Sequence, residues 1–558
     1  MAVLEKRGRF LVGEPLFGRG PRATVERGGA DVGDLVLVGS SKRGARVIRR
    51  LGRPDVARDV IEGLMLDRGL YRSYPRAASG EAEGAVGAPV ETSDSRVDLT
   101  DLPTFTIDPD DAQDFDDAIS ARREHGHIRV WVHIADVSAY LRPGGPLERE
   151  AFRRATSVYA PGAVEPMLPE ALSNRACSLR PGEEKLAVTL EMELHGAEAR
   201  SVSFHRSRIR SDRRLTYGEV DEIFVGTSRA EEPWGAPLEA AREVSRALGE
   251  KRDSVEIGSA EPHFDFDSEG HVAGVRFEAQ TESHRLIEQL MILANEQVAG
   301  YLADRRLPTL YRVHERPEAA SVSYLVEQLA SLDISTPPVP KNMTPQQAAD
   351  LVAEISRIVA REAKGRRAIG ILVLRALKQA FYTPRNLGHA GLASPRYCHF
   401  TSPIRRYPDV IAHRALLQGL GLDNGAVPAH ELEEAGVLCS AAERAAMQIE
   451  RAADDICLAF LLERRLAEAD PSAPPVFSGE VMGVIEKGAF VRFGDEGFEG
   501  LLPARRMRGW WELNELSTAL VADGSGKELR LGDRLEVTVD RVETARGRVD
   551  LVPAESYS

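Results

Sequence analysis

Apolar positions along the chain follow two periods, and the changes between them predict a series of β-rich and helical regions. Short apolar runs separated by glycine-rich turns fill residues 1–55, for example at 35–38, which is typical of a small β barrel. Residues 56–69 have the spacing of a helix. Residues 77–95 are rich in Ala, Gly, Ser and Glu with little to bury, which predicts either a linker or a marginal helix.

From residue 96 onward the chain mixes both periods, which predicts a mixed α/β domain. Strand-like runs occupy 128–134 and 186–194, and helical stretches occupy 283–304, 344–362, 407–417 and 431–468. After a proline-rich break at 471–475, short strands predict a five-stranded OB barrel. We therefore expect a multidomain protein with a barrel and connecting helix at 1–75, a linker at 76–95, a mixed α/β (α+β) domain at 96–470 and an OB barrel at 474–558.

Composition places these domains in a globular protein of the cytoplasm. The chain has 558 residues, of which 43% are hydrophobic, enough for packed cores in three or four domains. Its four cysteines are scattered without a C-x-x-C pair, which indicates neither a zinc site nor a disulfide framework. No apolar run approaches the roughly 18 residues of a membrane span. We expect a cytoplasmic protein without a membrane partner.

The net charge of −14 argues, taken alone, against a nucleic-acid partner. Local patches change this picture. Residues 1–55 contain twelve Lys or Arg against six acids, a balance of +6. Arg206, Arg208 and Arg210 alternate at the period of a strand and would share one face, and residues 361–367 are also basic. Each patch alone is typical of a solvated face, but together they indicate a basic channel for a phosphate backbone.

Six aspartates lie within ten residues in D-P-D-D-A-Q-D-F-D-D, at 108–117. Carboxylates this close repel one another, and a folded protein tolerates them in water or around a cation. The apolar residues Phe105, Ile107 and Phe115 frame the run and favour the cation over a solvated acidic loop. An EF-hand is excluded by the residues at its ligand and turn positions, because Gln113 replaces Gly and Ile119 replaces Glu. Oxygen-only ligation favours Mg²⁺ or Mn²⁺, ions that activate water against phosphodiesters.

Five segments resemble, in order, the RNB catalytic domain of the ribonuclease II/ribonuclease R family. They are T-I-D-P-D-D-A-Q-D-F-D-D (106–117), Y-A-P-G-A-V-E-P-M-L-P (159–169), R-L-T-Y (214–217), I-E-Q-L-M-I-L-A-N (287–295) and H-F-T-S-P-I-R-R-Y-P-D (399–409). The last region is similar to the family's S1-type RNA-binding barrel, and the first is expected to be its cold-shock-like OB barrel. The resemblance implies metal-dependent, processive hydrolysis of single-stranded RNA from the 3′ end to nucleoside 5′-monophosphates. We also expect activity as a monomer, and association with RNA-degradation machinery stays open.

The resemblance assigns the chemistry to named positions. Asp108, Asp114, Asp116 and Asp117 match an acidic quartet that holds Mg²⁺ (or Mn²⁺) and orients the attacking water. Asp110 and Asp111 fall between matched positions and are read as bystanders. Arg405 matches the arginine that grips the scissile phosphate and offsets the charge growing on its oxygens.

Four further positions match residues that bind the substrate. Tyr159 matches the aromatic residue that stacks on the 3′-terminal base, and Glu450 matches a glutamate that contacts the terminal nucleotides. Tyr217 and Glu288 match the pair that recognises the ribose 2′-hydroxyl and separates RNA from DNA. Ile257 takes the position matched to the second aromatic clamp residue of the ribonuclease II branch and lacks a ring. The region before residue 96 has room for one barrel, whereas familiar bacterial members carry two cold-shock barrels, so the branch stays open.

Two alternatives to the exoribonuclease remain. A catalytically inactive RNB-type protein that binds RNA as a regulator would be expected to lack members of the quartet or Arg405, and all are present. A protein stabilised structurally by Ca²⁺ or Mg²⁺ would not need Tyr159 and Tyr217 in their motifs.

Overall fold

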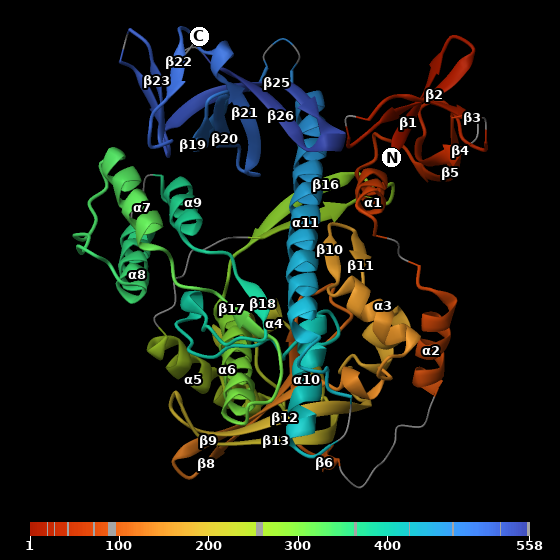
Figure 1. The fold of residues 1–558 in the computed structure, drawn as a ribbon, viewed down its shortest axis with the longest axis vertical. Helices are drawn as coiled ribbons and strands as arrows, with labels where there is room; N and C mark the ends of the chain where they lie inside the picture. Colours follow the sequence, from red (N-terminus) through yellow and green to blue (C-terminus); the bar gives the residue numbers. More distant parts are fainter. Residues whose placement is uncertain are drawn as a thin grey trace.

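A computed structural model describes residues 1–554, except 19, 27, 42, 43, 71, 72, 88–95, 253–260, 362–364, 423, 424, 471, 473 and 525. The long helix α11 joins a lower α/β body to an upper layer that contains two barrels (Figure 1). Among the described residues, no helix combines the length and apolar character that crossing a membrane requires.

The N-terminal barrel closes in the order β1-β2-β3-β5-β4. Its strands are β1 (Ala2–Arg7), β2 (Phe10–Pro15), β3 (Ala23–Glu26), β4 (Leu35–Ser41) and β5 (Gly44–Gly52). Leu4, Val25, Val36 and Ala45 fill its interior, as expected where alternate residues of each strand point inward. Helix α1 (Ala57–Asp67) follows and packs on β4 and on α11. The barrel and its connecting helix therefore agree with the apolar pattern of the sequence.

The segment after α1 forms a helix instead of an extended linker where it is described. Helix α2 (Arg76–Gly87) packs against α3 (Pro146–Arg154), and its residues Ala78 and Ala82 are buried there. Its alanines provide a small apolar face. A short helix is only marginally stable by itself, so α2 depends on packing of this face against its neighbour. The sequence left both a linker and a marginal helix open for this segment, and the structure has a helix over Arg76–Gly87.

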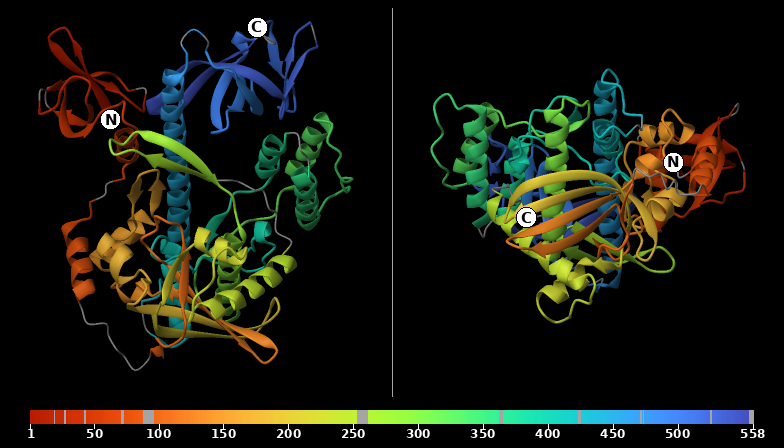
Figure 2. Two further views of the ribbon diagram at one scale, coloured as in Figure 1. Left: turned by 180° about the vertical axis from the view of Figure 1, so that it is seen from behind. Right: turned by 90° about the horizontal axis from the view of Figure 1, so that it is seen from below.

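A seven-stranded sheet is the centre of the α/β body, in the order β14-β7-β8-β9-β12-β13-β6. The strands are β6 (Val97–Leu99), β7 (Phe105–Asp108), β8 (Asp117–Glu124), β9 (His127–Ala135), β12 (Glu184–His195), β13 (Glu198–Arg210) and β14 (Arg213–Thr216). Ile119, Val132 and Leu190 belong to the apolar face, which packs on α5 (Gly235–Lys251) and α6 (Glu282–Asp304). From below, the strands lie side by side across the base of the molecule (Figure 2).

Smaller elements surround this sheet and shape the cavity described below. The two-stranded sheets are β10 (Val158–Ala160) with β11 (Ala163–Glu165), β15 (Glu261–Phe266) with β16 (Val272–Glu278), and β17 (Tyr311–Val313) with β18 (Phe381–Thr383). The remaining helices are α4 (Tyr217–Phe224), α7 (Ala319–Ser331), α8 (Pro345–Arg361), α9 (Arg366–Ala376) and α10 (Tyr407–Gly419). Short helical turns lie at Val137–Ala139, Ala171–Ala176, Ala390–Leu392, Ala504–Arg506 and Thr544–Arg546.

The C-terminal barrel closes in the order β19-β20-β21-β26-β25 and carries a three-stranded extension. The barrel strands are β19 (Phe477–Ile485), β20 (Gly488–Phe493), β21 (Phe498–Pro503), β25 (Arg534–Glu543) and β26 (Arg548–Pro553). The extension consists of β22 (Trp511–Leu513), β23 (Ala519–Ala522) and β24 (Glu528–Arg530). Five barrel strands after a proline-rich break confirm the OB-type expectation for this region.

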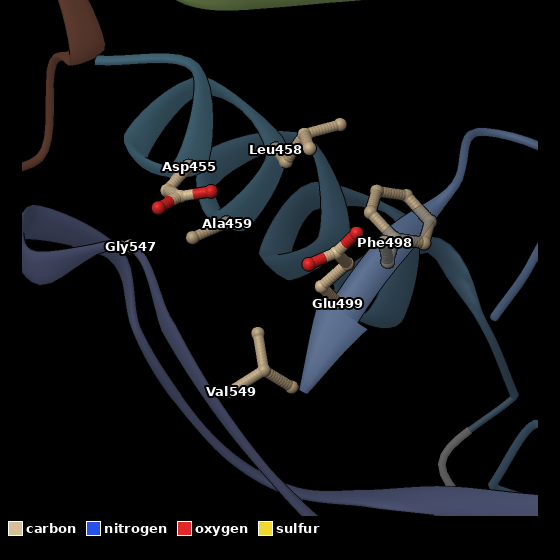
Figure 3. A pocket seen from close by; sticks show the side chains of 7 residues that line it. All are labelled: Asp455, Leu458, Ala459, Phe498, Glu499, Gly547 and Val549. Carbon is tan, nitrogen blue, oxygen red and sulfur yellow. The ribbon is translucent and has the colours of Figure 1, made fainter. Parts of the chain in front are cut away.

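Helix α11 (Leu432–Glu468) runs for 37 residues from beside β18 to the C-terminal barrel. Glycines permit close approaches near its start and about two thirds of the way along it. A Cβ at Gly436 would lie 2.7 Å from the carbonyl oxygen of Tyr382, and a Cβ at Gly547 would lie 2.6 Å from Cβ of Asp455. A small hollow remains at the second contact, lined by Asp455, Leu458, Ala459, Phe498, Glu499, Gly547 and Val549 (Figure 3).

Candidate active site

The strand order of the central sheet gathers the acidic residues at one edge. Asp108 ends β7 and Asp117 begins β8, so the loop between the two strands carries Asp114 and Asp116. Strand β14 runs parallel to β7 and places Thr216 beside Asp108. Thr216 also caps α4 through a capping box with Glu219, which sets Tyr217 at the first position of that helix. The sheet therefore brings the acidic loop and Tyr217 together.

A cavity of about 900 Å³ opens at this edge. Eight of the nine residues that the sequence marked as functional line it: Asp108, Asp114, Asp116, Asp117, Tyr159, Tyr217, Glu288 and Arg405. The ninth, Glu450, accepts a 2.9 Å hydrogen bond at Oε1 from the backbone N–H of Tyr159. Residues from five separated stretches of the chain thus meet around one cavity.

Three of the four aspartates lie where water is scarce. Only 9% of Asp108 and 5% of Asp116 is exposed. Burial, reinforced by the nearby charge of Asp117, raises the pKa of Asp108 to about 7. Burial likewise raises the pKa of Asp117 to about 6 and that of Asp116 well above its ordinary value. A carboxylate group held in this way gains stability from a positive charge beside it.

The donor set of the quartet fits a hard divalent cation. Oδ2 of Asp108 is buried and has no hydrogen-bond partner among the described residues, although buried polar atoms ordinarily have one. All four residues offer carboxylate oxygen, the ligand atom that Mg²⁺ and Mn²⁺ prefer. No three of these described residues bring one oxygen each within 4.8 Å of one another. Like charges repel at short range, and a cation would draw the oxygens together.

Two consecutive arginines after Ile404 have different environments. The side chain of Arg405 is 47% exposed toward the cavity, with Nε 3.8 Å from Oδ2 of Asp116. The N–H of Ile404 donates to Oδ1 of the same aspartate at 2.8 Å. The side chain of Arg406 is 19% exposed and donates to Asp409 at 2.8 Å, and the charge of Asp409 raises its pKa against the opposing effect of burial. Both arginines line the cavity, but Arg405 is the more exposed cation, and Arg406 anchors the turn.

Tyr159 connects the acidic loop to the long helix. It lies on the β10–β11 hairpin, and its phenol O–H donates to Oδ2 of Asp114 at 2.8 Å. Its side chain is 38% exposed, so one part of the ring remains open to the cavity. Burial, followed by the charge of Asp114, raises the pKa of Tyr159 and keeps the phenol protonated.

A histidine that the sequence analysis did not single out, His284, connects Tyr217 with Glu288. The ring of His284 stacks on Tyr217, with centroids 3.8 Å apart and an angle of 12° between the planes. His284 precedes Glu288 by four residues on α6, so both side chains share one face of the helix. Gln280 donates to Oε2 of Glu288 at 2.8 Å. The helical spacing to Glu288 was the signal that could have indicated His284.

Three positions considered in the sequence analysis were not assigned to the site: Asp110, Asp111 and Ile257. The side chain of Asp110 is exposed and does not line the cavity, whereas Asp111 is exposed at its rim. Arg214 donates to the backbone carbonyls of Pro109 and Asp110 and holds the loop between them. Ile257 lies outside the described residues.

Two of the three alternating arginines of β13, Arg206 and Arg208, are held by carboxylates and are not free for phosphates. Arg206 donates to the fully buried Asp136 at 2.7 Å, and Arg96 donates to the same oxygen at 2.7 Å. Arg208 pairs with Asp98 at 2.6 Å. The expectation was wrong for these two arginines, because the carboxylates that neutralise them come from distant segments. Arginines do line a second cavity of about 430 Å³, which shares Gln113, Glu170 and Asn174 with the first and adds Arg175 and Arg180.

The chain is similar to known proteins over most of its length. Residues 96–421 match the RNB domain, and residues 473–552 match the S1 RNA binding domain. Ribonuclease R of Escherichia coli strain K12 is 34% identical over 94% of this chain, which spans 66% of that protein's length. Ribonuclease R of Aquifex aeolicus is 36% identical over 90% of this chain and 72% of its own.

A solved structure shows the same fold. Mycoplasma genitalium RNase R in complex with ribose methylated single-stranded RNA superposes with a TM-score of 0.86 at 24% identity, over 99% of this chain and 89% of that one. The RNB match covers more than half of the chain, and the identity to the Aquifex protein exceeds 30% over most of both lengths. The chain belongs to the RNB family of ribonuclease R-like proteins.

Proposed function

We propose that the protein is a metal-dependent exoribonuclease that hydrolyses single-stranded RNA processively from the 3′ end and releases nucleoside 5′-monophosphates. The observation that carries this proposal is the meeting of the acidic quartet, Arg405 and Tyr159 around one cavity. Membership of the RNB family and the similarity to ribonuclease R support the same reaction.

The quartet would hold Mg²⁺, with Mn²⁺ as the alternative. When bound there, the cation lowers the pKa of a water molecule and offsets charge on the phosphate. Asp108, Asp116 and Asp117 supply carboxylates that burial makes receptive to a positive charge. The unpartnered oxygen of Asp108 is the contact that most needs a cation.

Arg405 would bind the scissile phosphate. Its guanidinium lies beside Asp116 and is the exposed cation nearest the quartet on this loop, so it can donate to phosphate oxygens as charge grows on them. A guanidinium presents two parallel N–H groups to a phosphate, a geometry that lysine cannot reproduce. Arg406 also lines the cavity but is less suited to this role, because its guanidinium donates to Asp409 and is less exposed.

The substrate-binding residues would select RNA without selecting a sequence. The open part of the Tyr159 ring offers a surface on which any base can stack. Tyr217 and Glu288 lie on neighbouring elements and would recognise the ribose 2′-hydroxyl, which DNA lacks. Glu450 would act through Tyr159, because it fixes the backbone of that residue.

We also infer that the protein acts as a monomer in a reducing compartment such as the cytoplasm. The cavity is built by one chain, which supports the first point. The four cysteines are buried and free, which supports the second.

Incubation of the full chain with 5′-labelled single-stranded RNA and Mg²⁺ tests the proposal. The label should pass through a ladder of fragments shortened one nucleotide at a time from the 3′ end, with 5′-monophosphates as the released product. Chelation by EDTA should stop the reaction. RNA that stays intact while bound to the protein would instead support an RNA-binding regulator without catalytic activity.

A further inference from the structure

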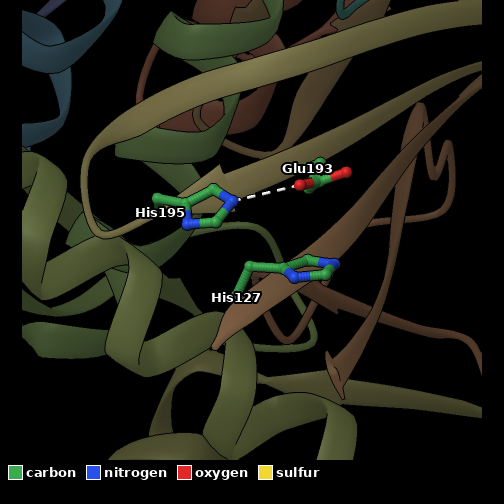
Figure 4. A group of neighbouring side chains, drawn as sticks. All are labelled: His127, Glu193 and His195. Atoms are coloured by element: carbon green, nitrogen blue, oxygen red, sulfur yellow. Dashed lines mark hydrogen bonds and ion pairs between the residues drawn. The ribbon is translucent and has the colours of Figure 1, made fainter. Parts of the chain in front are cut away.

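Two histidines and a glutamate meet at the far end of the central sheet, outside the catalytic cavity. His127, Glu193 and His195 each offer a ligand atom, and these atoms all lie within 4.8 Å of one another (Figure 4). His127 is the first residue of β9 and His195 is the last residue of β12. We propose that this cluster, the hairpin cluster, is a binding site for a divalent transition metal ion, with Zn²⁺ as its ion.

The register of the sheet places the three side chains on one face. In the β9–β12 ladder, Arg129 pairs with Glu193 and Ile128 pairs with Leu194. One more step along the same register brings His127 opposite His195. Residues two apart on a strand point to the same side, so Glu193 and His195 share a face, and His127 meets them across the strands. Rigid strands thus set the geometry of the hairpin cluster.

The distances suit a tetrahedral ion. Zinc bonds of about 2.0–2.1 Å at tetrahedral angles separate neighbouring ligand atoms by about 3.3 Å. Nε2 of His195 lies 3.0 Å from Oε1 of Glu193, and the rings of His127 and His195 stack with centroids 5.3 Å apart and planes 25° apart. Small rotations of exposed side chains would bring all three into range. Water would complete the coordination, since 43% of the His195 side chain is exposed.

Neighbouring charges leave the hairpin cluster open to a cation. Arg129 is the nearest positive group in the register, but Glu124 accepts two hydrogen bonds of 3.1 Å from it and Glu191 accepts one of 2.6 Å. Glu124 also contacts Nε2 of His127 at 2.9 Å, the kind of carboxylate contact that orients a metal-binding imidazole. The carboxylates compensate Arg129, and its charge does not oppose binding.

The nature of the ligands separates this site from the catalytic one. Imidazole nitrogen with one carboxylate favours Zn²⁺ over Mg²⁺, whereas the quartet offers oxygen alone. Along β9, His127 lies seven residues from Ile134, which pairs with Asp117. Seven residues of strand span about 23 Å. Zinc at the hairpin cluster would join the tips of the β8–β9 and β12–β13 hairpins without contacting the catalytic cavity.

Zinc binding by the full chain tests the proposal. The protein is stripped of metal, excess Mg²⁺ is added to occupy the quartet, and Zn²⁺ is titrated against a chromophoric chelator. We expect the unaltered protein to bind one more equivalent of zinc than His127→Ala or His195→Ala, or to bind it at least tenfold more tightly. His271→Ala is the matched control, because His271 is 38% exposed and lies 3.8 Å from Glu269. It should bind zinc as the unaltered protein does.

Two further readouts keep the outcome decisive. Zinc should raise the unfolding temperature of the unaltered protein and not that of His195→Ala, because only the former has both hairpin ligands. With Cu²⁺ in place of zinc, the electron paramagnetic resonance spectrum should show nitrogen coupling that His195→Ala loses. Should a histidine variant fail to fold, Glu193→Gln replaces it. Equal zinc affinity and equal unfolding temperatures for the unaltered protein and the cluster variants would overturn the proposal.

Discussion

The backbone N–H of Tyr159 donates a 2.9 Å hydrogen bond to the carboxylate of Glu450, although 291 residues separate the two in the sequence. The phenol of the same tyrosine donates to Asp114. Tyr159 is therefore held at its backbone by helix α11 and at its hydroxyl by the acidic loop. Its ring cannot move without disturbing one of these two carboxylates.

Replacing Glu450 is expected to weaken RNA binding more than it slows the chemical step. Glu450→Ala removes the acceptor for the Tyr159 amide, and hydrogen bonds to charged groups contribute about 1.5–3 kcal/mol. We expect KM to rise about tenfold or more while kcat falls less. Glu434→Ala, an exposed glutamate on the same helix, is the control. An unchanged KM in Glu450→Ala would show that Tyr159 does not depend on this contact.

Asp117→Asn is expected to stop hydrolysis and to preserve RNA binding. The change removes charge from the quartet while keeping the shape of the side chain, so metal binding fails and the fold remains. We expect a loss of at least about 1,000-fold in kcat, or about 4 kcal/mol of barrier. Binding to labelled RNA, measured by fluorescence anisotropy, should stay equal or tighten because a negative charge near phosphate is gone. Asp110→Asn, on the same loop, should retain activity.

DNA of the same sequence is expected to bind but to be cleaved poorly. Tyr217→Phe and Glu288→Gln each alter a group placed to recognise the 2′-hydroxyl, so RNA cleavage should fall about ten- to hundredfold. DNA cleavage should change little, so the ratio of the RNA cleavage rate to the DNA cleavage rate should fall. Rates on matched RNA and DNA oligonucleotides measure this ratio. Comparable RNA and DNA rates for the unaltered protein would refute ribose recognition at this site.

The raised carboxylate pKa values predict how pH affects the metal-free protein. Asp108 and Asp117 have pKa values of about 7 and 6 in the folded state, above the unfolded value near 3.9, so the folded state binds protons more tightly. This contribution to stability is present at low pH and is lost as pH rises through 6 and 7. The unfolding temperature without metal should fall from pH 5 to pH 8.

Added Mg²⁺ should offset that fall at pH 8 and have little effect at pH 5. Cations compete with protons for the same oxygens, so Mg²⁺ affinity should drop about tenfold per pH unit for each proton displaced. Calorimetry with and without Mg²⁺ measures both effects. Asp108→Asn should reduce the pH dependence, and a variant with an unchanged dependence would contradict the assignment to this residue.

Gly547→Ala is expected to disturb the contact between α11 and the C-terminal barrel. Gly547 has φ of +60°, and an added Cβ would lie 2.6 Å from Cβ of Asp455. Gly524 has φ of +73° with nothing within 4 Å of the added atom, so Gly524→Ala isolates the backbone cost of about 1 kcal/mol. The unfolding temperature should fall further in Gly547→Ala. Equal falls in the two variants would show that the barrel adjusts without strain.

The sequence predicts those features whose causes are local. Six aspartates in ten residues indicate a cation without knowledge of the fold, and apolar alternation indicates both barrels. Features with distant causes were not predictable. Arg206 is neutralised by Asp136, which comes 70 residues earlier, so its spacing on the strand suggested a free cation. Helix α2 forms because Ala78 and Ala82 pack on α3, a contact that composition does not reveal.

The same distinction holds within the candidate site. The place of His284 in the site was not predicted, because its stacking partner, Tyr217, belongs to a different element. Arg405 and Arg406 are identical in type and adjacent in sequence, and both line the cavity. The contact with Asp409 holds Arg406 and leaves Arg405 as the more exposed cation. Residue type can therefore be read from the sequence, whereas the direction of a side chain depends on contacts made elsewhere.

The length of helix α11 links the position of the C-terminal barrel to that of Glu450. Its 37 residues form a rod of about 55 Å, with Glu450 near the middle and the C-terminal barrel at one end. A tilt of about 5° at the lower end would displace the barrel by about 5 Å. The same tilt would shift Glu450 by about half as much and would pull on the amide of Tyr159. A displacement of the barrel along this rod would therefore reach Tyr159, the residue proposed to stack on the last base.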